Sequence, residues 1–405
     1  MVRGVETVDV VIVGGGIAGA SVAYYLARLG ARNVLVLEKG AVGAGASGRA
    51  SGLVAFLTAN HPGQAALLKA SADLYDTWET EIGGAPALDR VGALLPTPEA
   101  ERALVEREVA IMRAAGHRVD LLERDEAARL VPDWDLRDVA FTAYSPDSGA
   151  ADPPAVTTAL MNRARALGVR VYQGAEVTGI RTCGGRVVGV DSSRGPIDAG
   201  AVVIAAGAWS ASIGRLVGAE LAAGAVRHQA LHLRPPASVR LPFPGCYDPA
   251  NGIYFRPEAG GLVLAANAGP DDYPDEPPGD PDHFDPTTSA WYADWIVERL
   301  ARRIPALADA EVVGGHAGVY PRGGDGFPLL GPLREARGLY CLCDTAGNGI
   351  TSSPGLGRAL AETIVYGRTF VDIHPFRPSR FVEGAPIGVP YRHAAPATVS
   401  NWNVG

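Results

Sequence analysis

The chain has 405 residues, of which 47% are hydrophobic and 20% are charged, so it can bury a sizeable core and is not a disordered chain. Its 36 Lys and Arg residues against 44 Asp and Glu residues give a formal net charge of −8, which argues against a nucleic-acid partner held through phosphate contacts. Four cysteines are too few for a disulfide scaffold of this length and fit a reducing compartment. We therefore expect a cytoplasmic protein.

The N-terminal segment is typical of a strand, a glycine turn and a helix. We expect an apolar strand at residues 8–13, a turn at 14–16, a helix ending near Leu29 and a second strand at 33–37. Buried strands that alternate with helices indicate a parallel sheet covered on both faces. The uncharged run within this segment has the length of a membrane-spanning helix. Its glycines favour a βαβ unit instead, and we expect no membrane span.

Two kinds of segment alternate along the rest of the chain. Charged, helical patterns occupy residues 64–129, and a helix opened by Pro153 then leads into further sheet-like strands. Strands marked by Pro and Gly dominate after Arg227, and a helix follows at 289–304. Near the end, residues 338–367 again have the pattern of strand, glycine loop and helix, and we expect this helix to start near Pro354. The pattern predicts two interleaved domains, followed by a surface tail beyond Phe381.

The glycine turn carries the first motif of chemical interest. Gly14, Gly16 and Gly19 form G-x-G-x-x-G between the predicted strand and helix, an arrangement that lets backbone approach a pyrophosphate at a helix N-terminus. Glu38 ends the next strand 19 positions after Gly19, where a carboxylate accepts hydrogen bonds from an adenosine ribose and repels a 2′-phosphate. The sequence therefore predicts a dinucleotide site that is not of the NADP kind.

Further small-residue segments indicate a cofactor larger than a nicotinamide nucleotide. A second glycine-rich loop at 43–52 follows Glu38 directly, and the strand at 201–210 ends in Ala206 and Gly207. GVYPRGGDGFPLLGP and AGNGITSSPGLG add two more such segments.

In these motifs the chain resembles the D-amino-acid oxidase superfamily of FAD proteins, in particular its sarcosine oxidase, glycine oxidase and dimethylglycine dehydrogenase branch. The resemblance rests on GGGIAGASVAYYLARLG with Glu38, ASGRASGL, AAGAW, NGIYFRPEAGGL and the two later glycine segments. It implies FAD as cofactor and oxidation of a C–N bond, in which a hydride equivalent passes from a small amine or amino acid to flavin N5 and leaves an imine. Oxygen or another acceptor would then reoxidise the flavin.

The resemblance implies an α/β fold with a Rossmann-like FAD-binding domain interleaved with an α+β substrate domain built on a mostly antiparallel sheet. We expect the FAD-binding domain to comprise residues 1–58, 151–222 and 317–405. The substrate domain would then comprise residues 59–150 and 223–316.

Three departures from the family pattern bear on the chemistry. Gly318 and Arg49 stand where some members attach the flavin through Cys or His, so we expect non-covalent FAD. Tyr320 and Thr351 stand where relatives place an Arg or a Lys, which leaves carboxylate recognition open. Val263 stands near the position of the lysine that promotes reaction with oxygen, so oxidase and dehydrogenase activity both stay open.

The candidate residues fall into two groups. For substrate and catalysis we expect Tyr254, Arg49, His228 and Tyr320, while Arg256 and Arg322 are further cations able to hold a carboxylate. Contacts with FAD are expected from Gly14, Gly16, Ile17, Ala18, Gly19, Glu38, Lys39, Ala46, Ser47, Gly48, Arg49, Ala50, Ser51, Gly52, Val177, Ala206, Gly207, Trp209, Arg322, Gly347, Asn348, Gly349, Ile350 and Thr351.

Three residues that could suggest a metal or catalytic site have simpler structural interpretations. Cys341 and Cys343 lack the spacing of a metal site and fit buried strand residues, and we expect no metal. Asp325 precedes a glycine, as turn residues do, and we assign it no catalytic role.

The alternatives to amine oxidation are an FAD-dependent oxidoreductase of 2-hydroxy acids and a flavin-binding subunit that turns over no substrate of its own.

Overall fold

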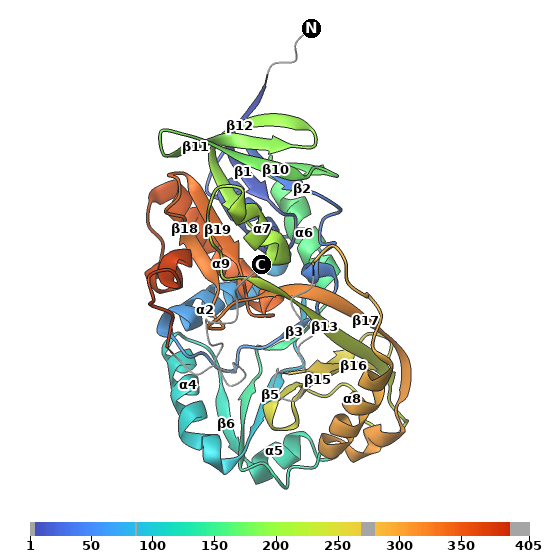
Figure 1. The fold of residues 1–405 in the computed structure, drawn as a ribbon. Coiled ribbons are helices and arrows are strands. Elements are labelled where there is room, and N and C mark those ends of the chain that lie inside the picture. The colour runs from blue at the N-terminus through green and yellow to red at the C-terminus, as the bar shows by residue number, and fades with distance from the viewer. Residues whose placement is uncertain (1–4, 86, 269–279, 389–405) are drawn as a thin grey trace.

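A computed structural model describes residues 5–85, 87–268 and 280–388 of the chain. Figure 1 shows one sheet near the N-terminal end of the molecule and a second sheet at the opposite end, with α2 (Pro62–Asp76) and α9 (Gly349–Tyr366) between them. The tail expected beyond Phe381 lies outside the described residues from position 389 onward.

The first sheet is built around parallel strands. Its order is β10-β11-β12-β1-β2-β9, and β19 pairs with β12 and with β18. The strands β1, β2, β9, β12 and β19 pair in parallel, as the N-terminal pattern predicts. The bounds are β1 Glu6–Val13, β2 Val34–Glu38, β9 Arg170–Gln173, β10 Val177–Cys183, β11 Arg186–Ser192, β12 Gly195–Ile204, β18 Leu329–Pro332 and β19 Leu339–Cys343.

Helices α1 (Ile17–Arg28), α6 (Pro153–Ala166) and α9 share one apolar core on this sheet with α2. The start of α6 is set locally, because the Asp152 side chain accepts a hydrogen bond from Ala155 N at 2.9 Å and a proline occupies the first helical position. On the other face of the sheet lie the connections around α7 (Ser210–Arg215).

The second sheet is mostly antiparallel and has the order β17-β13-β16-β15-β14-β5-β7-β6. One pair in it, β14 with β5, is parallel. Helix α8 (Ala290–Arg303) covers one face and buries Tyr292, Ile296 and Leu300 against it. The strands are β5 Ala93–Thr97, β6 Asp120–Glu123, β7 Phe141–Ser145, β13 Gly224–Arg234, β14 Gly245–Asp248, β15 Ile253–Glu258, β16 Leu262–Asn267 and β17 Glu311–Arg322.

The remaining elements are mostly short. Three of them form a small third sheet of order β3-β8-β4. The bounds of the remaining elements are β3 Leu53–Val54, β4 Leu88–Asp89, β8 Gly149–Ala151, α3 Trp78–Glu81, α4 Arg102–Ala114 and α5 Arg124–Leu130.

This architecture confirms the α/β fold class, with a Rossmann-like parallel sheet interleaved with a mostly antiparallel one. The residue boundaries of the two domains stay a prediction. β17 crosses the expected boundary at 316/317, and α2, placed in the substrate domain, packs on α9. None of the helices in the described part of the chain has the length and apolar character that crossing a membrane requires.

The expected start of the last helix near Pro354 is wrong, because α9 begins at Gly349 and Pro354 lies inside it. A proline in a helix leaves the carbonyl four residues earlier without its usual N–H partner. Here the Tyr75 hydroxyl donates to that carbonyl, Ile350 O, at 2.7 Å. The Ser71 hydroxyl accepts from Gly355 N at 2.8 Å. Two side chains of α2 therefore make the interior proline tolerable.

Candidate active site

The glycine turn after β1 is packed too closely for side chains. Gly14 has φ +110°, and a Cβ there would lie 2.4 Å from the carbonyl oxygen of Ala205. A Cβ on Gly19 would lie 2.0 Å from Gly14 O. Gly16 is the N-cap of α1 and caps the helix with no side-chain hydrogen bond. Apart from Ile17 N, which donates to Ser47 Oγ, the first backbone donors of α1 therefore receive no side-chain cap from the turn, and the positive dipole of the helix favours an anion there.

Glu38 is the last residue of β2, as the sequence predicts. Its carboxylate is fixed by two backbone donors, Gly15 N at 2.7 Å and Gly40 N at 2.7 Å. These bonds hold the carboxylate beside the glycine turn.

The loop at residues 46–52 lies against the same helix end. It starts with a short 3-10 helix, Ala46–Gly48, and Ser47 Oγ accepts a hydrogen bond from Ile17 N at 2.9 Å. The Arg49 guanidinium donates to Ala44 O, two residues before the loop. His316 Nε2 lies 3.0 Å from Arg49 O, which ties the loop to β17.

The remaining predicted cofactor residues lie on three elements. Val177 begins β10 and is buried in the core of the first sheet. Ala206 and Gly207 follow β12, and the Lys39 ammonium lies 4.2 Å from the centre of the Trp209 ring. Gly347, Asn348, Gly349, Ile350 and Thr351 form the turn before α9 and its first residues.

A cavity of about 320 Å³ opens between these loops and the second sheet. Residues of the 46–52 loop and the turn before α9 line it together with His228, Tyr254, Tyr320 and Arg322. Among the described residues that line it, Arg49 and Arg322 are cations, and no Asp, Glu or Lys side chain contributes. The cavity is therefore suited to a neutral or anionic ligand group.

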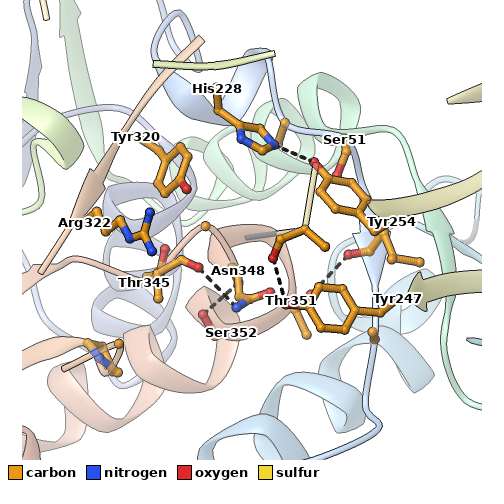
Figure 2. A pocket seen from close by; sticks show the side chains of 18 of the residues that line it. Ser51, His228, Tyr247, Tyr254, Tyr320, Arg322, Thr345, Asn348, Thr351 and Ser352 are labelled. Atoms are coloured by element: carbon orange, nitrogen blue, oxygen red, sulfur yellow. Dashed lines mark hydrogen bonds between the residues drawn. The ribbon is translucent and has the colours of Figure 1, made fainter. Parts of the chain in front are cut away.

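His228 and Tyr254 form a hydrogen-bonded pair in this cavity. His228 Nε2 lies 3.0 Å from the Tyr254 hydroxyl, and the two rings are stacked with 6.0 Å between centroids (Figure 2). Burial, aided by the Arg322 and His316 charges, lowers the pKa of His228 from 6.5 to about 4. Burial also raises the pKa of Tyr254 to about 12. At neutral pH the site thus presents an uncharged imidazole and an intact phenol.

Tyr320 and Arg322 flank this pair on β17. The Tyr320 ring packs edge-on against His228 with 5.5 Å between centroids. Residues two apart on a strand point to the same side, and Figure 2 shows Tyr320 and Arg322 side by side near Thr345. An arginine is therefore present in the cavity two residues after the position where the family pattern places one.

Arg256 differs from its sequence-based interpretation as a cation able to hold a substrate carboxylate. It is neither a surface residue nor part of the cavity lining, because its side chain is only 4% exposed and packs behind the cavity wall. Its guanidinium donates to Ser51 O and pairs with Glu258.

Several residues escaped the sequence reasoning. Tyr247 lines the cavity and donates to Ala268 O at 3.0 Å, and Gln229 and Asn267 line it from neighbouring strands. Asp344, at the end of β19, is fully buried, and burial raises its pKa to about 8. No local motif signals these residues, because their strands come together only in the folded sheet.

The two cysteines of β19 and Asp325 have the structural positions that the sequence indicates. Cys341 and Cys343 are buried on β19 with their Sγ atoms 3.4 Å apart. Asp325 accepts from Phe327 N at 3.1 Å in a turn and also binds the buried Arg380. Within the described ranges, no group of three or more His, Cys, Asp or Glu side chains is arranged to hold a metal ion.

These features fit FAD. The close-packed glycine turn leaves room for a pyrophosphate at the N-terminus of α1, and Glu38 stands where a ribose is held. Trp209 Nε1, beside Lys39, is buried with no hydrogen-bond partner among the described residues. A polar group of a bound cofactor would supply one.

Comparison with known proteins agrees with this fit. A family model described as "FAD dependent oxidoreductase" matches residues 9–363. Glycine oxidase of Geobacillus kaustophilus is 30% identical over 385 residues, which cover 92% of this chain and 97% of that relative. Human mitochondrial dimethylglycine dehydrogenase is 27% identical over 93% of this chain. The chain spans only 44% of that dehydrogenase's length.

Solved structures show the same architecture. L-proline dehydrogenase from P. horikoshii superimposes with a TM-score of 0.86 and 25% identity, covering 94% of this chain and all of that one. The glycine oxidase structure from Geobacillus kaustophilus gives a TM-score of 0.79 and 31% identity over 93% of this chain and 99% of that one.

Proposed function

The chain belongs to the FAD dependent oxidoreductase family, and on that premise we propose that it oxidises the C–N bond of a small amine or amino acid. When bound, FAD supplies the acceptor for a hydride equivalent from the substrate carbon. The substrate leaves as an imine, which water hydrolyses. Glu38, the glycine turn after β1, the 46–52 loop and the start of α9 are the residues that would hold the cofactor.

The observation that carries this proposal is the uncharged His228–Tyr254 pair in the cavity between those loops and the second sheet. An amine arrives mainly as an ammonium ion and must lose a proton before its C–H bond can be oxidised. The Tyr254 phenol can donate to the imidazole while its oxygen accepts from the ammonium. The low pKa of His228 leaves the imidazole unprotonated at neutral pH, so it accepts the phenol hydrogen bond and adds no positive charge beside the ammonium.

The charge of the cavity favours a substrate that carries a carboxylate. The presence of Arg322 in the cavity supports this, because arginine offers two parallel donors to the two carboxylate oxygens. Since no carboxylate lines the described part of the cavity, a substrate with several ammonium groups is disfavoured. We therefore favour an amino acid, or an N-alkylated one, over a simple amine.

The attachment and reoxidation of the cofactor are part of the proposal. Gly318 has no side chain to form a linkage, and Arg49 is not a flavin nucleophile, which supports non-covalent FAD. Oxygen and another electron acceptor both stay possible partners. A cytoplasmic location, expected from the few cysteines, stays a prediction.

The experiment that tests the proposal is anaerobic reduction of the bound flavin, which is monitored as the loss of flavin absorbance. The panel holds secondary amines, L- and D-amino acids, N-methyl amino acids and 2-hydroxy acids. We expect bleaching by one or more amino acids or N-methyl amino acids, with a weaker response in Arg322→Met than in wild type. Bleaching by 2-hydroxy acids alone, or by nothing in the panel, would overturn the proposal.

A further inference from the structure

Tyr254 and Arg256 approach the same residue of the cofactor loop. They are two positions apart on β15, so their side chains point to the same side of the sheet. Figure 2 shows the Ser51 side chain beside the Tyr254 phenol, and Ser51 acts on the phenol by lowering its pKa against the effect of burial. Arg256 Nε donates to the carbonyl oxygen of Ser51 at 2.5 Å.

The Arg256 side chain is fixed at every donor group that the structure describes. Its Nη2 atom pairs with a Glu258 carboxylate oxygen at 2.8 Å, and Nη1 donates to Pro257 O at 2.9 Å. Burial of a guanidinium is costly unless its donors are satisfied. Such a side chain acts as a rigid support, unlike the exposed Arg234, which pairs with Glu311 on the same sheet.

The loop is held equally firmly just after Ser51. Gly52 has φ +71°, and a Cβ there would lie 2.2 Å from Ala151 O. Ser51 also lines the cavity that His228 and Tyr254 share. The position of Ser51 is therefore set between β15 on one side and β8 on the other.

We propose that Arg256 is a positioning residue that couples the 46–52 loop to Tyr254 through Ser51. Arg256 holds the Ser51 carbonyl, and the Ser51 side chain then holds the Tyr254 phenol in its orientation toward the cavity. Loss of Arg256 lets the loop and the phenol move relative to each other. This inference rests on the proposed function, because it assigns Tyr254 to the substrate.

A double-mutant cycle tests the coupling. Arg256→Met should lower kcat/KM by roughly tenfold in the wild-type background, as expected for loss of one charge-assisted contact. In the Tyr254→Phe background the same change should have a much smaller effect. Arg256→Lys, which keeps one donor, should recover part of the loss. Arg234→Met serves as the control and should leave kcat/KM unchanged.

A second measurement does not depend on turnover. Amide hydrogen exchange of residues 46–52 in the FAD-loaded protein should be faster in Arg256→Met than in wild type or Arg234→Met. If Arg256→Met fails to fold, Glu258→Gln, which removes only the supporting charge, should give smaller changes of the same kind. Equal losses of kcat/KM in both backgrounds, or unchanged exchange of the loop, would overturn the coupling. Faster exchange in a protein whose flavin no amine reduces would instead contradict the proposed function alone.

Discussion

His228 Nε2 lies 3.0 Å from the Tyr254 hydroxyl although the two residues stand on strands that are not neighbours. β16 runs between β13 and β15, and its residue at this level is Ala266, opposite both Ala230 and Tyr254. Cross-strand partners share a face of the sheet. His228 lies two residues before Ala230 on the same face, so the imidazole and the phenol meet diagonally over β16, beside the small side chain of Ala266. The pair therefore depends on a methyl side chain that takes no part in the chemistry.

That relationship gives the first prediction. Ala266→Leu should separate the two rings and lower kcat/KM as much as Tyr254→Phe does, by roughly tenfold to a hundredfold, the cost of one lost polar contact. FAD should stay bound in both variants, since its predicted contacts lie on other segments. Steady-state kinetics with the best substrate of the panel and the FAD content of the purified variants check this. Wild-type kinetics in Tyr254→Phe would show that the phenol only packs.

The second prediction concerns pH. The folded protein keeps His228 neutral down to about pH 4, whereas its ordinary pKa is 6.5. Between these values the unfolded chain binds a proton that the folded chain does not bind. The free energy of unfolding should therefore fall as pH decreases from 6.5 to 4, by at most about 3 kcal/mol from this residue.

His228→Gln should remove that contribution and leave a shallower dependence of stability on pH. Denaturant unfolding at several pH values gives the free energy of unfolding of both proteins. The other titrating groups contribute equally to both, so their effects cancel in the difference. Identical slopes for the two proteins would contradict the lowered pKa.

The sequence could predict the nucleotide half of the site because its signals are local. Gly14, Gly16, Gly19 and Glu38 follow one another within one βαβ unit, and the structure places each at the expected element. The substrate side could not be assembled in the same way. Contact between His228 and Tyr254 requires the strand order β13-β16-β15, which no local pattern indicates.

The third prediction tests the ribose assignment. Glu38→Gln should weaken FAD binding more than it changes the reduction rate of flavin still bound, because the residue lies at the glycine turn and outside the substrate cavity. Fluorescence titration of the apoprotein with FAD and rapid-mixing reduction measure the two effects. Glu298→Gln, an exposed change on α8, is the control. Unchanged FAD affinity in Glu38→Gln would exclude the ribose role.

The fourth prediction concerns cofactor attachment. Acid precipitation should release all of the flavin into the supernatant as FAD, since Gly318 and Arg49 offer no linkage. Absorbance of the supernatant and of the redissolved pellet checks this. Flavin that stays with the precipitated chain would reveal a covalent bond to some other residue.

Helix α9 shows why its start could not be predicted. Pro354 normally marks a helix boundary, and the side chains that compensate for it come from α2, nearly three hundred positions earlier. Tyr75 donates to Ile350 O with |i−j| = 275, and Ser71 accepts from Gly355 N with |i−j| = 284. Tertiary contacts thus extend the helix back to Gly349, so that its N-terminus lines the cavity.

The last prediction follows from that compensation. Tyr75→Phe removes the donor to Ile350 O while it keeps the ring, which is 4% exposed and stacks on Trp78. A buried carbonyl without a partner costs about 1–3 kcal/mol, so the free energy of unfolding should fall by that amount. Tyr366→Phe, at the exposed end of the same helix, should change it by less than about 0.5 kcal/mol. Denaturant unfolding of the FAD-loaded proteins measures both. If the two variants were equally stable, α9 would tolerate Pro354 without help from α2.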